Sequence, residues 1–308
     1  MKAIVQSQYG DESTLHLVEI DDVKVVKPDD ILIDVHYCNV TAGDKNINTL
    51  SQPWYLQIMI RLVFGWNKPR AVVRGICGSG VIAQVGSSVT GYKVGDHVNF
   101  INSMKAGVAA EKLILNDKSI VSVLNPEVSL QEAACIPFGF LSAYHFLNES
   151  TLSKSVDVYL YGASGSVGSA ALSLAHMFEA NVVAVASAKH HQQLSSIHSQ
   201  PILDYQTQDV FNLNQKFDVV FDAVGKIQRK QITHLLKPSG KFLSIKSVTK
   251  EDKQRLAFLN DCLSHKRIQP IIEKVVNLVD YKEAFAHAYQ GHKTGNILIR
   301  IKDEHSNE

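Results

Sequence analysis

The chain has 308 residues, of which 45% are hydrophobic and 20% are charged, with 31 Lys and Arg against 30 Asp and Glu. This length and composition predict two globular domains, and the net charge of +1 provides no long-range field for nucleic acid or anionic lipid. We therefore expect a small-molecule partner, no nucleic acid and no stable membrane association.

The placement of apolar residues and cysteines favours a cytoplasmic protein. The first residues lack the apolar core of a signal peptide, and no apolar run reaches the roughly 18 to 20 residues that span a bilayer. The four cysteines are scattered and form no CxxC pair, which is typical of free thiols in a reducing compartment.

The first third of the chain predicts a mostly β unit that extends to about residue 124. In residues 31–37, the apolar residues Ile31, Ile33 and Val35 alternate with other residues, as in a half-buried strand. Further strand signals, separated by Gly, Asp and Pro turns, lie at 3–5, 15–20, 80–86 and 93–98.

Residues 53–66 are unusually apolar and leave two main interpretations open. The simpler one is a helix buried against the domain, and the other is a lid over an aromatic substrate. A membrane-surface role is disfavoured because only Arg61 and Lys68 provide basic charge.

From residue 125 the pattern changes to alternating helices and buried strands, which predicts a doubly wound parallel sheet. The predicted strands lie at 156–161, 182–186, 202–205, 217–221 and 241–245.

The tail has strand signals at 275–279 and 296–301 and a helix signal at 283–289, and we expect it to complete the first domain. We therefore assign residues 1–124 and 269–308 to a substrate domain and residues 125–268 to a cofactor domain. Residues 303–308 are predicted to form a disordered end.

Residues 162–168 form a glycine-rich turn between an apolar strand and a helix with a small, apolar face. Small residues let the backbone approach a pyrophosphate, and the free amides at a helix start attract the anion. The context of strand, turn and helix predicts a dinucleotide site. Its predicted contacts are Gly162, Ser164, Gly165, Ser166, Val167 and Gly168.

The end of the second strand of this domain favours NADPH over NADH. An NAD site usually has Asp or Glu there, but this chain reads Ala186-Ser187-Ala188-Lys189. A hydroxyl and a cation suit the 2′-phosphate, so we predict contacts from Ser187 and Lys189. The adjacent His190 and His191 are interpreted as a solvated helix start.

Several further segments occur in a distinctive order. They are 30–33 with 39–44, Tyr92-Lys93-Val94-Gly95-Asp96-His97-Val98, 133–137 leading into 141–143, Ile202-Leu203-Asp204-Tyr205, 217–225 and Gly291-His292-Lys293-Thr294-Gly295-Asn296. With the glycine turn, they make the chain resemble the zinc-free quinone oxidoreductase branch, with its zeta-crystallin-like proteins, of the medium-chain dehydrogenase/reductase superfamily. The resemblance implies an α/β fold, with a GroES-like, mostly β substrate domain and a Rossmann-type doubly wound parallel sheet.

The resemblance also implies roles for single residues. Tyr205 is expected beside Lys189 at the 2′-phosphate, although packing at a strand end explains it equally well. Matching positions near the ribose and nicotinamide, and in the terminal motif, are Val224, Gly225, Ser244, Ile245 and Asn296.

Three residues are candidates for the catalytic centre, namely Thr41, Asp44 and Ser142. Thr41 stands where the family often has Asn, but it retains a hydrogen-bonding group. Thr41 and Ser142 have a plain alternative role, because small hydroxyl residues at element ends often satisfy backbone groups. No residue identifies itself as a proton donor, so solvent protonation is the working hypothesis.

Zinc is not expected. Zinc-dependent relatives need about three ligands, whereas the corresponding places read Thr41, Ile76-Cys77 and Phe138. The 13 histidines are mostly dispersed, without ligand spacing on one helix face.

These features predict hydride transfer from NADPH to a quinone or an α,β-unsaturated carbonyl, without a metal. The alternatives are an enoyl-thioester or aldehyde reductase of the same superfamily, and a non-catalytic NADPH-binding redox sensor. By analogy with relatives that pair through edge strands, we expect a homodimer.

Overall fold

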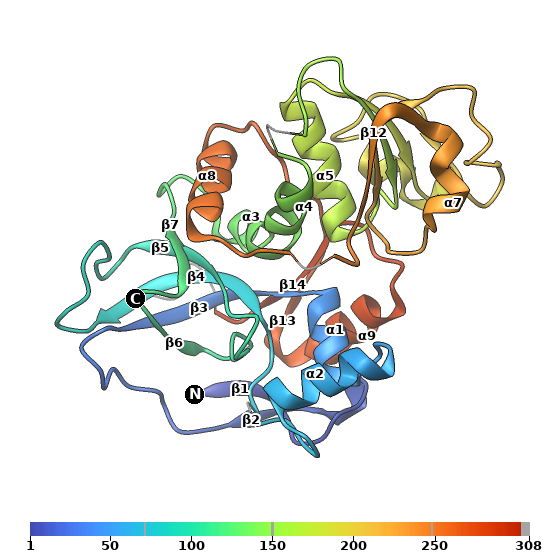
Figure 1. The fold of residues 1–308 in the computed structure, drawn as a ribbon. Coiled ribbons are helices and arrows are strands. Elements are labelled where there is room, and N and C mark those ends of the chain that lie inside the picture. Colours follow the sequence, from blue (N-terminus) through green and yellow to red (C-terminus); the bar gives the residue numbers. More distant parts are fainter. Residues whose placement is uncertain (71, 149–150, 248, 303–308) are drawn as a thin grey trace.

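The computed structural model describes residues 1–70, 72–148, 151–247 and 249–302, so the predicted disordered end at 303–308 lies outside the described residues. Figure 1 shows two lobes, with a largely antiparallel sheet in one and a parallel sheet in the other. The predicted α/β fold class is confirmed.

The first lobe is built around a long central strand, β3 (Asp30–Val40), whose alternating residues Ile31, Ile33 and Val35 are fully buried. The strand order is β13-β14-β3-β4-β5-β7, and β6 also pairs with β3. The other bounds are β4 (Cys77–Val85), β5 (His97–Ile101), β6 (Lys112–Asn116) and β7 (Ile120–Val123). A hairpin of β1 (Lys2–Gln6) and β2 (Leu15–Glu19) lies beside this sheet (Figure 1).

The tail of the chain returns to this sheet, as expected. Strand β14 (Asn296–Arg300) pairs with β3, with Ile299 opposite Cys38, and β13 (Ile272–Asn277) lies on its other side. Helix α9 (Tyr281–Gln290) connects the two tail strands and packs against α1 (Ala42–Thr49). The exact domain boundaries near residues 124 and 269 stay a prediction.

The second lobe contains a parallel sheet of order β10-β9-β8-β11-β12. Its strands are β8 (Asp157–Tyr161), β9 (Asn181–Val185), β10 (Ile202–Leu203), β11 (Phe217–Asp222) and β12 (Leu236–Ser244). Helix α5 (Ser166–Met177) starts at the glycine turn and packs on this sheet, with Ala171 and Leu174 fully buried. Strand β12 begins five residues earlier than the sequence predicts.

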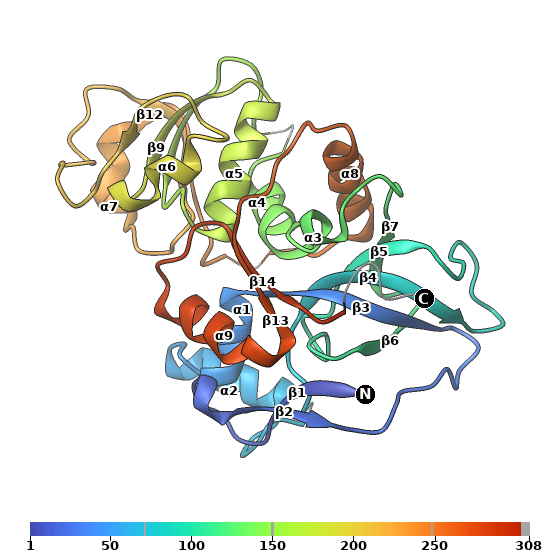
Figure 2. The same cartoon turned by 180° about the vertical axis from the view of Figure 1, so that it is seen from behind.

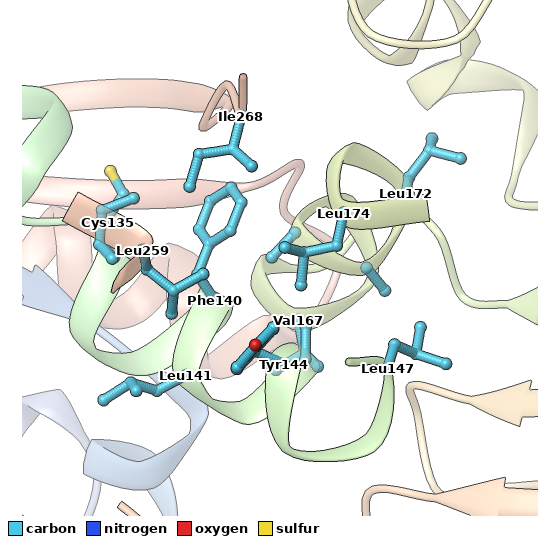
Figure 3. Packing of buried hydrophobic residues seen from close by; sticks show 14 of the residues in the cluster. Cys135, Phe140, Leu141, Tyr144, Leu147, Val167, Leu172, Leu174, Leu259 and Ile268 are labelled. Carbon is cyan, nitrogen blue, oxygen red and sulfur yellow. The ribbon is translucent and has the colours of Figure 1, made fainter. Parts of the chain in front are cut away.

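Apolar helices fill the space between the sheets. Figure 3 shows Phe140, Leu141 and Tyr144 packed among side chains of α5 and α8. The remaining helices are α3 (Leu130–Ala133), a π-helical turn (Ile136–Phe140), α4 (Leu141–Phe146), α6 (His191–Leu194), α7 (Arg229–Ile232) and α8 (Lys253–Ser264).

The apolar segment 53–66 forms the expected helix, α2 (Trp54–Phe64), but most of it is not buried. Trp54 is 73% exposed, Met59 62% and Leu62 61%, whereas Phe64 alone in this helix is fully packed. The expectation of a buried helix is therefore wrong. Apolar residues lie on all sides of this helix, so the sequence does not indicate which side packs against the domain. No helix in the described part of the chain is long and apolar enough to cross a bilayer.

Candidate active site

A cavity opens where the glycine turn meets the returning tail. Helix α1, the π-helical turn and the end of α9 each contribute one lining residue: Ala42, Phe138 and Ala288. The others are Tyr161, Gly162, Ser164, Gly165, Ser166, Val167, Ala186, His190, Tyr205, Ala223, Val224, Lys226, Ile245, Gly291, His292 and Lys293. Residues 53–66 contribute nothing to this lining, so the structure does not favour the lid interpretation.

The glycines of the turn serve different purposes. A Cβ on Gly162, whose φ is +84°, would lie 2.1 Å from Val224 Cγ2, and a Cβ on Gly168 would lie 2.0 Å from the Gly162 carbonyl oxygen. These two glycines are required for close packing. A Cβ on Gly165 would meet no atom within 4 Å, so this position faces open space in the cavity.

The start of α5 fits the pyrophosphate of a dinucleotide. Gly165 is the N-cap of this helix, and no side chain caps its first amides. Those amides and the positive end of the helix dipole attract an anion, and the missing Cβ at Gly165 leaves the space it needs. Gly162, Ser164, Ser166 and Val167 line the cavity with Gly165, whereas Gly168 lies outside the lining, and the cofactor contacts of all six residues stay a prediction.

The returning tail holds the glycine turn from the other side. The Gly295 amide donates to the Ser164 carbonyl at 2.7 Å, and Ser166 Oγ donates to the Gly295 carbonyl at 2.8 Å. Both views of the fold show the tail passing beneath α5 (Figure 1, Figure 2). The cavity therefore has walls from segments about 130 residues apart in sequence.

The predicted 2′-phosphate residues lie near one end of the cavity. Tyr205 lines it and is 43% exposed, while the exposed Lys189 lines an adjoining hollow with His190. Ser187 is buried and its Oγ donates to Gln206 Oε1 at 2.9 Å, so this hydroxyl is already engaged.

His190 departs from its sequence interpretation. It is buried, it lines the cavity, and its Nδ1 lies 2.6 Å from Thr294 Oγ1. Burial, followed by the nearby Lys189 charge, lowers its pKa, which favours a neutral imidazole. The prediction of a solvated His190 is therefore wrong.

The predicted nicotinamide end is shaped by a buried carboxylate that the sequence interpretation missed. Val224 and Ile245 line the cavity, whereas Gly225 and Ser244 lie outside the lining. Asp222 is fully buried, and its carboxylate accepts from the amides of Val224, Gly225 and Ile227 at 2.8 to 3.1 Å. An aspartate at a strand end before a glycine is the signal that points to this turn.

The catalytic candidates Thr41 and Asp44 are committed to a helix cap. The Asp44 carboxylate accepts from the Thr41 amide at 2.8 Å and from Thr41 Oγ1 at 2.7 Å, and the Asp44 amide donates back to Thr41 Oγ1. This capping box starts α1. Burial raises the pKa of Asp44, and the bonds from Thr41 oppose that shift. Neither residue lines the cavity, and Ser142 is buried outside it as well, so their catalytic roles stay a prediction.

Asn296 makes structural hydrogen bonds, and its predicted cofactor contact stays a prediction. It is buried, its Nδ2 donates to the Ile271 carbonyl at 3.0 Å, and its Oδ1 accepts from Asn39 Nδ2 at 3.0 Å. These bonds hold β14 beside β3, so the amide is directed into the protein interior.

Lys293 is a functional candidate that the sequence interpretation missed. It lines the cavity and is only 9% exposed, and its Nζ donates to the Val40 carbonyl at 3.0 Å. Burial lowers its pKa to about 8, against the opposing effect of Asp44 and other acidic groups. A lysine between a histidine and a threonine carries no sequence pattern that predicts such burial.

The positions that hold zinc in metal-dependent relatives have no metal-binding character here. Thr41 is engaged in the cap, Ile76 is buried, and Phe138 presents an aromatic ring. Among the residues that the structure describes, no three His, Cys, Asp or Glu side chains are grouped to hold a metal ion. Zinc independence stays a prediction.

A GroES-like sheet, a Rossmann-type sheet and a cavity at the glycine turn form the arrangement in which nicotinamide-dependent oxidoreductases bind their cofactor. In agreement, residues 27–155 match the family model of the alcohol dehydrogenase GroES-like domain.

The chain is also similar to two named reductases over almost all of its own length. The chain is 28% identical to the 2-methylene-furan-3-one reductase of Solanum lycopersicum and 27% identical to the chloroplastic NADPH-dependent alkenal/one oxidoreductase of Arabidopsis thaliana. Each match covers 97% of this chain and 79% of the relative. The quinone oxidoreductase structure from Coxiella burnetii shares the fold, with a TM-score of 0.84, 21% identity and coverage of 98% and 99% of the two chains. The chain is therefore similar over almost all of its length to reductases of alkenals and enones, and it shares the fold of a quinone oxidoreductase.

Proposed function

We propose that the protein is a zinc-independent, NADPH-dependent reductase of quinones or α,β-unsaturated carbonyl compounds. The observation that carries this proposal is the open space at Gly165, beside the uncapped start of α5 and in one cavity with Ala42 and Phe138. A pyrophosphate fits the first part of this cavity, and a planar, apolar acceptor fits the second. The names of the tomato and Arabidopsis relatives support an enone-type acceptor.

Each part of the cavity has its own task in this proposal. The first amides of α5 hold the pyrophosphate, Lys189 and Tyr205 hold the 2′-phosphate, and Val224 and Ile245 border the nicotinamide ring. When bound, NADPH supplies a hydride. The protein holds the acceptor beside it and excludes water with the Phe138 ring, so that positioning provides most of the rate enhancement.

The proposal needs no Lewis acid, because a quinone or enone is already electrophilic. The side chains of Ile76 and Phe138 have no lone pair that suits zinc, and the Thr41 hydroxyl already donates to Asp44. We include a cytoplasmic location in the proposal. We also include a homodimer formed through an edge of the parallel sheet, where β12 is the outer strand of the described order.

The test measures binding and turnover separately. Purified protein is titrated with NADPH and NADH by fluorescence, and cofactor oxidation is then followed with naphthoquinone, phenanthrenequinone and short-chain enones, with and without EDTA. We expect tighter NADPH binding, turnover with at least one acceptor class, and no effect of EDTA. Stoichiometric zinc or a strong NADH preference would contradict the proposal. NADPH binding without turnover of any acceptor would favour a binding protein instead.

A further inference from the structure

The Lys293 amino group is buried with few partners. Among the described residues, Val40 is the one that accepts a hydrogen bond from Nζ, at 3.0 Å. An ammonium group has three N–H donors, so this contact leaves two of them unused. A buried lysine of this kind is costly, and such groups commonly have a task at a functional site.

The charges around Lys293 neutralise it only in part. The acidic groups that act on it are Asp44 at the start of α1 and Glu273 on β13, together with the thiols of Cys77 and Cys135. Burial raises the pKa of both thiols, so they stay neutral. The Asp44 carboxylate is occupied by Thr41. Burial therefore dominates and brings the pKa of Lys293 to about 8.

The position of Lys293 in the cavity favours contact with the acceptor. Its amino group is bonded to the Val40 carbonyl, two residues before Ala42, and Ala42 and Phe138 line the same cavity. The 2′-phosphate end, marked by Ala186 and Tyr205, is built from a different part of the chain. Lys293 thus lines the cavity together with residues of α1 and the π-helical turn, and its ammonium group is held at the end of β3, just before α1.

We propose that Lys293 is the acid that protonates the acceptor when hydride is transferred, an inference that rests on the proposed function. With an enone, the hydride that NADPH would supply leaves a C–H bond of the dihydronicotinamide, which is oxidised to NADP+, and forms a C–H bond at the β-carbon. The C=C electrons shift to a new double bond at the carbonyl carbon, and the C=O electrons move to the carbonyl oxygen. One N–H bond of Lys293 breaks and its proton goes to that oxygen, which leaves a neutral amine and an enol. The enol tautomerises to the ketone, and solvent returns a proton to Lys293. A quinone takes one hydride and one proton in the same way and becomes a hydroquinone.

The experiment compares Lys293→Met, Lys293→Arg and a matched control, Lys282→Met. Lys282 is exposed on α9 and lies outside the lining of the cavity, so its removal takes one positive charge from the returning tail without touching the buried amine. Lys293→Met keeps the length of the side chain and removes the proton, whereas Lys293→Arg keeps the charge but does not release a proton near neutral pH.

We expect Lys293→Met and Lys293→Arg each to lower kcat about 100-fold or more, as loss of a general acid does. The Kd for NADPH, read by fluorescence, should stay within about threefold of wild type, on the order of 0.7 kcal/mol or less. Wild-type activity should decrease above pH 8, because the acid is then deprotonated. Both Lys293 variants should show no such decrease. Lys282→Met should retain both kcat and the decrease of activity above pH 8.

A second measurement needs no turnover. The apoprotein is labelled with acetic anhydride at a series of pH values, and the peptide with Lys293 is quantified by mass spectrometry against peptides with exposed lysines. We expect its labelling to rise with a midpoint near pH 8, well below that of the exposed lysines. A midpoint equal to theirs would contradict the assignment.

The outcomes separate the two proposals. Unchanged kcat and pH profile in Lys293→Met would overturn the role of Lys293 alone. A tenfold or larger loss of NADPH affinity with kcat retained would instead make Lys293 a pyrophosphate contact. Absence of turnover by the wild-type protein with every acceptor would overturn the proposed function, and the acid role with it.

Discussion

Replacing Gly165 by alanine should separate binding from folding. The backbone at Gly165 has φ of −68° and ψ of 173°, which alanine adopts without strain, and a Cβ there would touch no atom within 4 Å. Replacing a glycine in such a conformation stabilises a protein by about 0.4 to 1 kcal/mol, because the unfolded chain loses freedom. We therefore expect the free energy of unfolding of the apoprotein to stay the same or rise slightly.

The same methyl group should interfere with the cofactor. It would project into the space beside the first amides of α5, where the pyrophosphate is proposed to lie. Loss of one charge-assisted hydrogen bond costs about 1.5 to 3 kcal/mol. That cost corresponds to a Kd for NADPH roughly 10 to 150 times higher.

Gly168→Ala is the matched control, because its Cβ would lie 2.0 Å from the Gly162 carbonyl oxygen. Overpacking of this kind costs about 1 to 3 kcal/mol, so this variant should unfold at lower urea concentration. Urea denaturation of the apoproteins and fluorescence titration with NADPH measure both quantities. Gly165→Ala with wild-type affinity would refute the location of the pyrophosphate, and a loss of stability like that of Gly168→Ala would refute the open space.

Three further predictions concern other parts of the molecule. Ser187→Asp should weaken NADPH binding by about 1 to 3 kcal/mol and leave the affinity for NADH unchanged, because a carboxylate repels the 2′-phosphate. In the same titrations, the control Ser195→Asp, at the exposed end of this segment, should change neither affinity. Trp54→Ser should change the free energy of unfolding by only about 0.5 kcal/mol, because the side chain is 73% exposed; a loss above 2 kcal/mol in urea would show that the helix face is covered. Burial, with a smaller effect of His176, lowers the pKa of His198 from 6.5 to about 4. Between these pH values the unfolded chain binds more protons than the folded chain, so the free energy of unfolding should fall from pH 6.5 toward pH 4. The urea midpoint of His198→Gln should fall less over this range than that of the wild type.

Local patterns predicted most of the fold. The alternation in residues 31–37 indicated β3, and the glycines at 162–168 indicated the start of α5, because both signals depend on neighbours only a few residues apart. The mostly β unit and the doubly wound parallel sheet followed from the same reasoning, whereas their GroES-like and Rossmann-type character was implied by the family resemblance.

The parts that sequence did not predict depend on distant segments. His190 is buried because Thr294, 104 residues later, lies against its ring. Lys293 is buried because the tail carries it to the Val40 carbonyl, 253 residues earlier. The apolar residues of α2 predicted a helix, but the face it covers depends on tertiary packing. A sequence pattern that repeats every few residues cannot report contacts between such distant segments.

The return of the tail also affects how the protein is synthesised. On one edge of β3, residues 30–34 pair with β6 and residues 37–40 pair with β14, with Leu298 opposite Asn39. The second part of this edge therefore lacks its partner until β14 has been translated. Pairing between strands so far apart in sequence is slow, and an unpaired strand edge is prone to aggregation. We therefore expect residues 37–40 of β3 to need protection during translation, and the cavity to gain the wall formed by residues 291–293 only after the tail has folded back.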